Sequence, residues 1–316
     1  CREKRIKADS ERHQLFKRKR ILRVAQEFIP YYKYLFRSIG FDARDVGSLN
    51  DIKQLPYLDK ATVRRAPQMF CQQRLSSLFK LVGHTSETTG TPVRIYQNPS
   101  AVLRERVFQQ RIARWCGYVK GKKRIWLRGD MIVPLRQTVP PFWRYNAIDK
   151  QLMMSSYHIS LHTLPSYVEK IRNFAPDMIT AYPSSLYLIA KFMRNMHLPP
   201  IKVERIVTSS ESLLLNQRRL IEDMFKCRVY DMYGSVERVA QIGTCEFRSY
   251  PVMEHYGFTE FITSGPNEYE IVSTGFNNSL MPLIRYKTGD FVQLSVTPEN
   301  CPCGRAFRMI KSIKGR

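Results

Sequence analysis

Three short segments combine residue types that can do chemistry. The first is the hydroxyl-rich stretch Thr85-Ser86-Glu87-Thr88-Thr89-Gly90-Thr91-Pro92. In a loop between two strands, hydroxyls and backbone N–H groups can wrap phosphate oxygens, as a Gly-rich phosphate loop does. Taken alone, this stretch could equally be an ordinary Ser/Thr-rich surface loop.

The second and third segments each join an aromatic residue to a carboxylate. Tyr233-Gly234-Ser235-Val236-Glu237 directly follows a predicted strand over residues 229–232, and ligands of open α/β sheets bind beyond the carboxyl ends of strands. An aromatic ring there can stack on a purine, and a carboxylate can hold Mg²⁺ against phosphates. In Tyr286-Lys287-Thr288-Gly289-Asp290, an aspartate after a glycine turn suits a bidentate bond to two ribose hydroxyls. Singly, each could be a surface turn or a hairpin turn.

The elements around these segments must position them. Apolar residues at helical spacing predict a helix over residues 11–39, interrupted at Pro30, and a second helical region between Leu49 and Pro56. Predicted strands at 78–82, 93–96, 124–128, 178–181, 205–208 and 229–232 then alternate with predicted helices at 99–116, 166–174, 185–196 and 215–225. This alternation predicts a largely parallel sheet covered on both faces. Short strands at 259–263, 268–272 and 291–294 predict a smaller β-rich portion.

In combination, the order, spacing and flanks of the three segments resemble the adenylate-forming (AMP-binding) superfamily. Its pattern is a Ser/Thr/Gly phosphate loop, Tyr-Gly-x-x-Glu, Tyr-x-Thr-Gly-Asp and Gly-Arg, the last being Gly315-Arg316 here. Within that superfamily the chain is similar to the phenylacetate–CoA ligase family, nearest to its capsular-polysaccharide-biosynthesis branch. This closer similarity is carried by residues 142–146 (FWRYN), 155–160 (SSYHIS), 181–185 (AYPSS), 208–211 (TSSE), 233–240 (YGSVERVA) and 301–305 (CPCGR).

The resemblance implies an α/β fold, the large N-terminal domain of an adenylate-forming enzyme. Mostly parallel sheets would be layered with helices, and a smaller β-rich portion would follow. We expect a basic N-terminal helical region over 1–78, an α/β nucleotide-binding core over 79–256, and a β-rich portion over 257–316 that ends at the hinge. The small C-terminal domain that follows the hinge in this superfamily is expected to be absent.

The activity implied by the resemblance is ATP-dependent activation of a small carboxylic acid to an acyl-adenylate. The acyl group would pass to CoA, to a carrier pantetheine or to another acceptor, in polysaccharide biosynthesis for the named branch. The implied nucleotide-binding residues are Thr85, Ser86, Thr88, Thr89 and Gly90 at the phosphates, Ser210, Glu211, Tyr233 and Gly234 around the adenine, Asp290 at the ribose, and Arg316 at the hinge. Glu237 would coordinate Mg²⁺. The catalytic set is Glu237, Thr85 and His158, where His158 borders the acid pocket or, as the alternative, is structural.

One departure from the family pattern weakens this interpretation. Glu87 stands where the family's phosphate loop normally has glycine. A carboxylate beside phosphates repels them, and a side chain hinders close approach of the backbone. Together with the expected absence of the small C-terminal domain, Glu87 leaves open a degenerate, non-catalytic adenylation domain that serves as a scaffold or binding subunit, including one at a membrane surface.

Seven cysteines, an odd number scattered over the chain, do not form a secreted disulfide framework and indicate a reducing, cytoplasmic compartment. Cys301 and Cys303 are spaced as a C-x-C pair, and Cys245 precedes the same β-rich portion. The resemblance implies a structural Zn²⁺ bound by these three cysteines, with His255 as a candidate fourth ligand. The alternative is that the cysteines are free and buried, acting as small hydrophobes.

The charge balance is strongly basic. The 316-residue chain has a net charge of +24, and its first 24 residues include the cluster Lys17-Arg18-Lys19-Arg20. Such a surplus of positive charge favours binding to an anionic membrane surface or to a polyanionic partner. The alternative is that the basic cluster is part of a solvated helix. No nucleic-acid-reading motif is present, so a specific nucleic-acid partner is not expected. Without an apolar run long enough for a signal peptide or a membrane span, we expect a cytoplasmic protein that could lie peripherally on a membrane.

Overall fold

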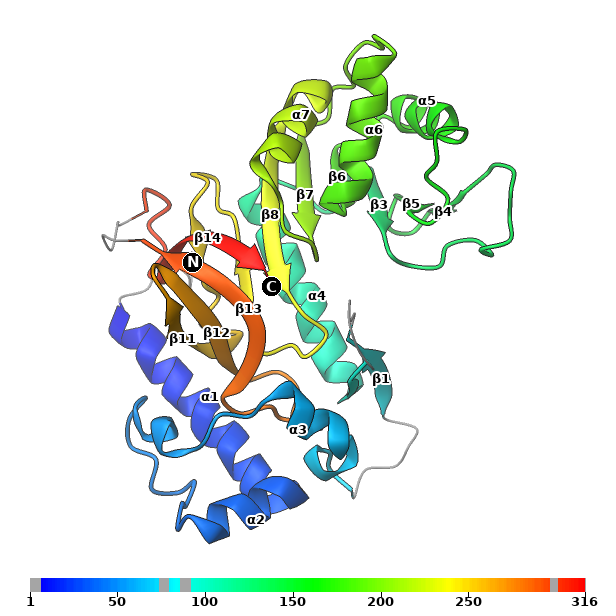
Figure 1. Cartoon of the computed structure of the whole chain (residues 1–316). Coiled ribbons are helices and arrows are strands. Elements are labelled where there is room, and N and C mark those ends of the chain that lie inside the picture. Colours follow the sequence, from blue (N-terminus) through cyan, green and yellow to red (C-terminus); the bar gives the residue numbers. More distant parts are fainter. Residues whose placement is uncertain (1–6, 74–79, 86–91, 296–300, 316) are drawn as a thin grey trace. The chain divides into compact units, whose positions relative to one another are not determined.

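The protein divides into two compact units. A computed structural model describes residues 7–73, 80–85, 92–295 and 301–315. The first unit comprises Cys1–Gln110, Tyr233–Gly243 and Ser249–Arg316, and the second comprises Arg111–Met232 and Thr244–Arg248 (Figure 1). The predicted phosphate-loop residues Ser86, Thr88, Thr89 and Gly90, with Glu87 and Arg316, lie outside the described residues. The three sequence regions 1–78, 79–256 and 257–316 stay a prediction.

The first unit opens on helices. Helices α1 (Lys7–Phe28) and α2 (Pro30–Ser38) are separated as expected at Pro30, which takes the first position of α2. Proline fits there because the N–H that it lacks has no partner in the first helical turn. The second predicted helical region is only the 3₁₀ turn η2 (Asp51–Gln54), and α3 (Lys60–Arg65) and η3 (Pro67–Phe70) follow. These helices share a buried core that includes Leu22, Ile29, Phe36, Ile52, Phe70, Leu283 and Tyr286.

Two antiparallel sheets complete the first unit. Strands β1 (Leu81–His84) and β2 (Arg94–Gln97) form a hairpin whose connection carries the predicted phosphate loop. The larger sheet has the strand order β10-β14-β13-β12-β11, and α1 packs beside β11 (Figure 1). Its strands are β10 (Tyr250–Pro251), β11 (Gly257–Gly265), β12 (Glu268–Gly275), β13 (Tyr286–Leu294) and β14 (Met309–Gly315). Strand β9 (Gln241–Gly243) also belongs to the first unit.

The second unit is a helix-covered sheet with strand order β4-β5-β3-β6-β7-β8. Strands β5, β3, β6, β7 and β8 pair in parallel, and only β4 is antiparallel to its neighbour. The strands are β3 (Arg124–Arg128), β4 (Trp143–Asn146), β5 (Gln151–Ser155), β6 (Met178–Ala181), β7 (Arg205–Ser209) and β8 (Arg228–Gly234); the helices are α5 (Leu164–Phe174), α6 (Pro183–Asn195) and α7 (Leu215–Phe225). Helix α4 (Pro99–Trp115) belongs to the first unit as far as Gln110 and to the second from Arg111. Their buried core includes Ile125, Leu127, Ile179, Leu186, Ile206 and Phe225. The expected α/β fold, with a largely parallel sheet and a β-rich portion, is confirmed.

The basic helix α1 is not simply a solvated face. Arg18 is fully buried, stacks its guanidinium 3.5 Å from the centroid of the Phe258 ring and donates to the Leu49 carbonyl. Burial lowers the pKa of Arg18 to about 10, so the side chain stays charged at neutral pH. Arg20 and Arg23 are exposed, as expected of a solvated helix. The sequence therefore misplaced Arg18, because a charge cluster does not show which members face the core.

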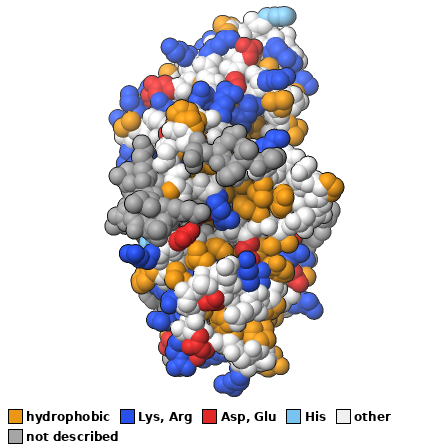
Figure 2. All heavy atoms as spheres, turned by 90° about the vertical axis from the view of Figure 1, so that its left-hand side faces the viewer, with side chains coloured by type: hydrophobic (Ala, Val, Ile, Leu, Met, Phe, Trp, Pro, Cys, Tyr) orange, Lys and Arg blue, Asp and Glu red, His pale blue; other side chains and the backbone are white. Residues whose placement is uncertain are grey.

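Elsewhere the basic surplus is spread over the surface. On the face shown in Figure 2, Lys and Arg side chains are scattered among hydrophobic patches, with fewer Asp and Glu. Among the described helices, none combines the length and the apolar composition needed to cross a membrane.

Candidate active site

Tyr233 and Asp290 form a hydrogen-bonded pair in the first unit. Tyr233 lies near the end of β8, and its hydroxyl donates to Asp290 Oδ2 at 2.8 Å. Asp290 follows Gly289, whose φ of 71° lies in the left-handed region where glycine has no side chain to strain the turn. Burial raises the pKa of Tyr233 well above its usual range, and the carboxylates of Asp290 and Glu237 raise it further. The phenol is therefore held protonated and can only be a donor to Asp290.

Glu237 is buried beside a hydroxyl and an ammonium group. It is 5% exposed, accepts a hydrogen bond from the Tyr286 hydroxyl at 3.1 Å, and has its Oε1 3.7 Å from Lys60 Nζ. Lys60 is the first residue of α3, a helix that Asp59 caps by accepting from the Thr62 N–H at 2.6 Å. A carboxylate in this position suits a hard divalent cation, and Lys60 adds a positive charge that could meet a phosphate oxygen.

Thr85 closes the base of the predicted phosphate loop. Its hydroxyl accepts from the Val93 N–H at 2.9 Å, and its own N–H donates to the Val93 carbonyl at 3.2 Å. The hairpin also contacts the segment that carries Glu237, because Gln97 Nε2 donates to the Val236 carbonyl at 2.9 Å. A Cβ on Gly83 would lie 3.2 Å from Val236 Cγ1, so a side chain there would require Val236 to move by a few tenths of an ångström. Within the first unit, Tyr233 thus meets Asp290 and lies close to Glu237, and the hairpin that carries Thr85 contacts Val236, the neighbour of Glu237.

Three further predicted residues, Ser210, Glu211 and His158, lie in the second unit. Ser210 has a φ of 71°, and its hydroxyl accepts from Arg128 Nη2. Glu211 accepts from both the N–H and the hydroxyl of Ser184, each at 3.0 Å. Ser184 lies in the first turn of α6, where backbone N–H groups lack intrahelical partners. The Glu211 carboxylate therefore caps α6, a role that its motif did not reveal.

His158 is held by a hydroxyl and an aromatic ring. Its Nδ1 lies 2.7 Å from Ser155 Oγ, and its ring stacks on Phe142 with centroids 5.0 Å apart. Its Nε2 is buried and has no hydrogen-bond partner among the described residues. This environment fixes the orientation of the His158 ring.

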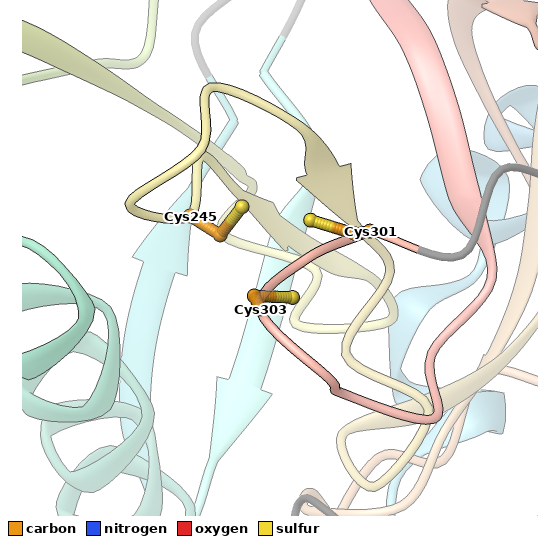
Figure 3. Close-up of side chains that lie close together, drawn as sticks. All are labelled: Cys245, Cys301 and Cys303. Carbon is orange, nitrogen blue, oxygen red and sulfur yellow. The ribbon is translucent and has the colours of Figure 1, made fainter.

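Three cysteine sulfurs converge (Figure 3). The thiol sulfurs of Cys245, Cys301 and Cys303 all lie within 4.8 Å of one another, and all three residues are buried. Zinc–sulfur bonds of about 2.3 Å in a tetrahedral site place neighbouring sulfurs about 3.8 Å apart, so the group fits a tetrahedral metal after a small contraction. Burial and the neighbouring Cys301 raise the pKa of Cys303, so a bound cation would have to displace its proton.

His255 is not part of this cysteine group. Among the described residues, the metal-competent group contains only Cys245, Cys301 and Cys303. The His255 ring instead lies edge-on to the rings of His13 and Phe307, at centroid distances of 5.2 and 5.4 Å. The prediction of His255 as the fourth ligand was therefore wrong, because a position in the sequence does not show where a side chain lies in the fold.

Lys60 is the site residue that the sequence did not indicate. It belongs to none of the three motifs, and its only local signal is the capped start of a six-residue helix. Its approach to Glu237 spans 177 positions of the chain and depends on tertiary folding.

Comparison with known proteins identifies similar proteins. No family model matches the chain. It is 29% identical over 280 residues to protein CapK of Staphylococcus aureus, covering 85% of this chain and 62% of that one. It is 22% identical over 311 residues to phenylacetate-coenzyme A ligase of Thermus thermophilus, covering 94% and 68%. The chain is similar to members of the phenylacetate–CoA ligase family of the adenylate-forming superfamily. The match to CapK agrees with the branch expected from the motifs.

A solved structure shows the same fold. The crystal structure of 2-hydroxyisobutyryl-CoA ligase in complex with 2-HIB-AMP and CoA has a TM-score of 0.78 and 19% identity, and the match covers 100% of this chain and 70% of that one. The chain spans about three fifths of the length of CapK and about two thirds of the Thermus ligase.

Proposed function

We propose that this chain activates a small carboxylic acid with ATP, giving an acyl-adenylate and pyrophosphate. The observation that carries the proposal is the cluster of motif residues in the first unit, where Tyr233 is bonded to Asp290 and Glu237 is close enough to raise the Tyr233 pKa. Relatives named as phenylacetate-coenzyme A ligases, and a fold neighbour crystallised with an acyl-AMP and CoA, support the same chemistry. CoA, a carrier pantetheine or another acceptor would take the acyl group.

Each residue of the cluster has a task in this reaction. Asp290 accepts hydrogen bonds from the ribose hydroxyls, and Tyr233 holds its carboxylate in place. Glu237 would hold Mg²⁺, which neutralises phosphate charge when bound. Lys60 supplies a fixed positive charge beside Glu237, and Thr85 anchors the predicted phosphate loop. The acid's carboxylate oxygen attacks the α-phosphorus, an acyl–phosphate bond forms, the bond to the β-phosphate breaks, and pyrophosphate leaves.

Pyrophosphate exchange tests the proposal directly. A panel of aliphatic, aromatic and hydroxylated carboxylic acids is incubated with the protein, Mg–ATP and labelled pyrophosphate. Label should enter ATP only with the acids that the protein activates, and Asp290→Asn should remove this exchange. If no acid supports exchange and Mg–ATP does not raise the melting temperature, the chain is the non-catalytic scaffold considered above.

We propose that the three cysteines bind a structural Zn²⁺. The support is the convergence of their sulfurs in a buried group, with a donor set that zinc prefers (Figure 3). The fourth ligand is left unassigned. A cytoplasmic location, a carrier protein, an anionic membrane surface and a place in polysaccharide biosynthesis are further proposals, the last supported by the similarity to CapK.

A further inference from the structure

A cavity of about 280 Å³ lies in the first unit, and none of the motif residues lines it. Helix α1, helix α4 and the segment after β12 line it. None of its lining residues belongs to the cluster of Tyr233, Glu237 and Asp290. Its size is near the lower end of the range for small-molecule pockets.

Three cations line this cavity. They are Lys17 and Arg20 of α1 and Arg104 of α4, and none of the described lining residues is acidic. Lys17 is held in place because its Nζ donates to the His255 carbonyl at 2.9 Å. Neither Arg20 nor Arg104 forms an ion pair or hydrogen bond with a described residue. Their guanidinium groups are therefore available to an anion.

The acidic residue next to Arg104 is already engaged. Glu105 accepts hydrogen bonds from Tyr256, from Gln109 at 3.2 Å and from Gln241 at 3.4 Å. Its carboxylate is thereby held by partners other than the cavity cations. The positive charge of the cavity is not balanced by its own walls.

The rest of the lining is apolar apart from Asn277, whose amide donates to the Tyr256 carbonyl at 3.3 Å, and the Ser279 hydroxyl. Phe108 and Phe276 are buried, and Phe108 is fixed edge-on to the Tyr256 ring with centroids 5.0 Å apart. Ile21 adds an aliphatic surface. The Ser279 hydroxyl accepts from Asn98 Nδ2 at 3.2 Å, which leaves its own hydrogen for another acceptor. The cavity therefore offers donors and positive charge beside hydrophobic rings.

We propose that this cavity binds a soluble phosphate monoester with a small aromatic or aliphatic organic part. A phosphate monoester carries close to two negative charges at neutral pH and three acceptor oxygens, which match two guanidinium groups and an ammonium group. A carboxylate ligand would leave most of that charge unmatched. The rings of Phe108 and Phe276 cover the organic part. The site is independent of the acyl-adenylate chemistry proposed above.

Phenyl phosphate is the probe, and its binding is measured by isothermal titration calorimetry on the full chain without ATP. We expect saturable binding that weakens as KCl is raised, because the contacts are ionic. Arg20→Ala and Arg104→Ala should each weaken binding about tenfold, the usual effect of losing a charged hydrogen bond that is partly solvated. Arg23→Ala is the matched control, since it removes the same charge from an exposed position of α1 outside the cavity.

Two further ligands and one further variant decide between outcomes. Inorganic phosphate should bind more weakly than phenyl phosphate, and equal affinity would overturn the role of the apolar wall. Asp290→Asn should leave phenyl phosphate binding unchanged; loss of binding there would place the probe at the nucleotide residues and overturn the proposal. Vesicles of phosphatidylcholine with phosphatidic acid distinguish a lipid headgroup, and binding to these vesicles without binding to phenyl phosphate would also overturn it.

Discussion

Hydrogen bonds to neighbouring residues hold Asp290 in position. Tyr233 donates to Oδ2, and the backbone N–H of Asp290 donates to the Thr288 hydroxyl at 3.1 Å. Because the Tyr233 pKa is raised by burial and by two carboxylates, the phenol keeps its proton at neutral pH. The tyrosine of this motif therefore acts here through its hydroxyl, and its ring packs against the core that contains Ile242 and Val292.

Tyr233→Phe should test this positioning role. The ring and its packing remain, while Asp290 loses one donor, so we expect kcat/KM for ATP to fall about five- to tenfold in pyrophosphate exchange. Tyr269→Phe is the matched control: Tyr269 packs against the same core, and its hydroxyl has no hydrogen-bond partner among the described residues. An equal loss in both variants would show that the effect comes from packing.

Glu87→Gly tests the departure from the family's loop. A carboxylate near the ATP phosphates costs on the order of 1 kcal/mol per charge pair at the effective dielectric of a surface loop. Its removal should tighten Mg–ATP binding several-fold and speed pyrophosphate exchange. The measurement is the KM for ATP, with Glu87→Gln separating the effect of charge from that of side-chain bulk. Loss of activity in Glu87→Gly would instead give the carboxylate a role of its own.

At the scale of elements, the sequence predicted the bounds of helices and strands best where the element packs into a single hydrophobic core. Strands β3 and β6 and helix α7 were predicted with the observed bounds, because their apolar residues follow a single period. Strand β4 was missed since its exposure does not alternate, and β5 was missed since its Leu-Met-Met run lacks β-branched residues. Strand β14 was missed because lysine and serine interrupt its apolar residues.

The residues of the candidate active site could be predicted from the sequence only where residues of two motifs contact each other in the fold. Tyr233 and Asp290 are named by their motifs and do meet, although 57 positions separate them. Glu211 belongs to a motif but caps α6, and Lys60 lies beside Glu237 without belonging to one. Such contacts depend on how helices and loops pack, and a single sequence does not encode them as a local pattern.

A buried ion pair joins β11 to the segment that enters β13. Arg285 donates to both oxygens of Glu260, at 2.8 and 3.1 Å, and both side chains are 7% exposed. Glu260 also offsets the charge of Arg18, which is fully buried on α1. The Glu260 carboxylate thus pairs with the Arg285 guanidinium group and offsets part of the charge of the Arg18 guanidinium group.

Glu260→Gln should lower the free energy of unfolding by about 3 kcal/mol, because it removes the paired carboxylate of buried Arg285 and part of the negative charge that offsets buried Arg18. Urea unfolding at neutral pH measures the change. Glu268→Gln, which removes an exposed pair with Lys314 at 3.4 Å, should cost less than about 1 kcal/mol. Similar small losses in both variants would mean that the buried pair does not stabilise the sheet.

Zinc binding by the cysteine group is testable by metal content. Purified protein should contain about one zinc per chain, Cys303→Ser should lose it, and Cys71→Ser should retain it because Cys71 is not part of the group. A strong chelator should also lower the melting temperature of the wild type, since the metal binds only the folded chain. Metal-free wild-type protein whose melting is unaffected by added zinc would refute the site.

At the scale of the whole molecule, the buried Tyr32 and Tyr256 and the partly buried Tyr233 link stability to alkaline pH. Burial raises the pKa values of Tyr32, Tyr233 and Tyr256 above the usual value, and carboxylates of Asp290 and Glu105 add to the effect at the latter two. In the unfolded chain these phenols lose their protons near pH 10. The folded chain therefore binds more protons than the unfolded chain above that pH.

The stability that these tyrosines contribute is accordingly complete below about pH 10 and is lost as the pH rises toward their folded-state pKa values. Each one should steepen the fall in unfolding free energy by about 1.4 kcal/mol per pH unit in that window. Urea unfolding at several pH values between about 9 and 11 measures this slope.

Tyr256→Phe should make this slope shallower by about 1.4 kcal/mol per pH unit. The variant also loses the hydrogen bond to Glu105 and therefore starts from a lower stability. Tyr34→Phe, at a side chain that is 78% exposed, should leave the slope unchanged because solvent surrounds that phenol in both states. If Tyr256→Phe lowers stability equally at every pH, the phenol contributes its hydrogen bond alone and its proton is not linked to folding.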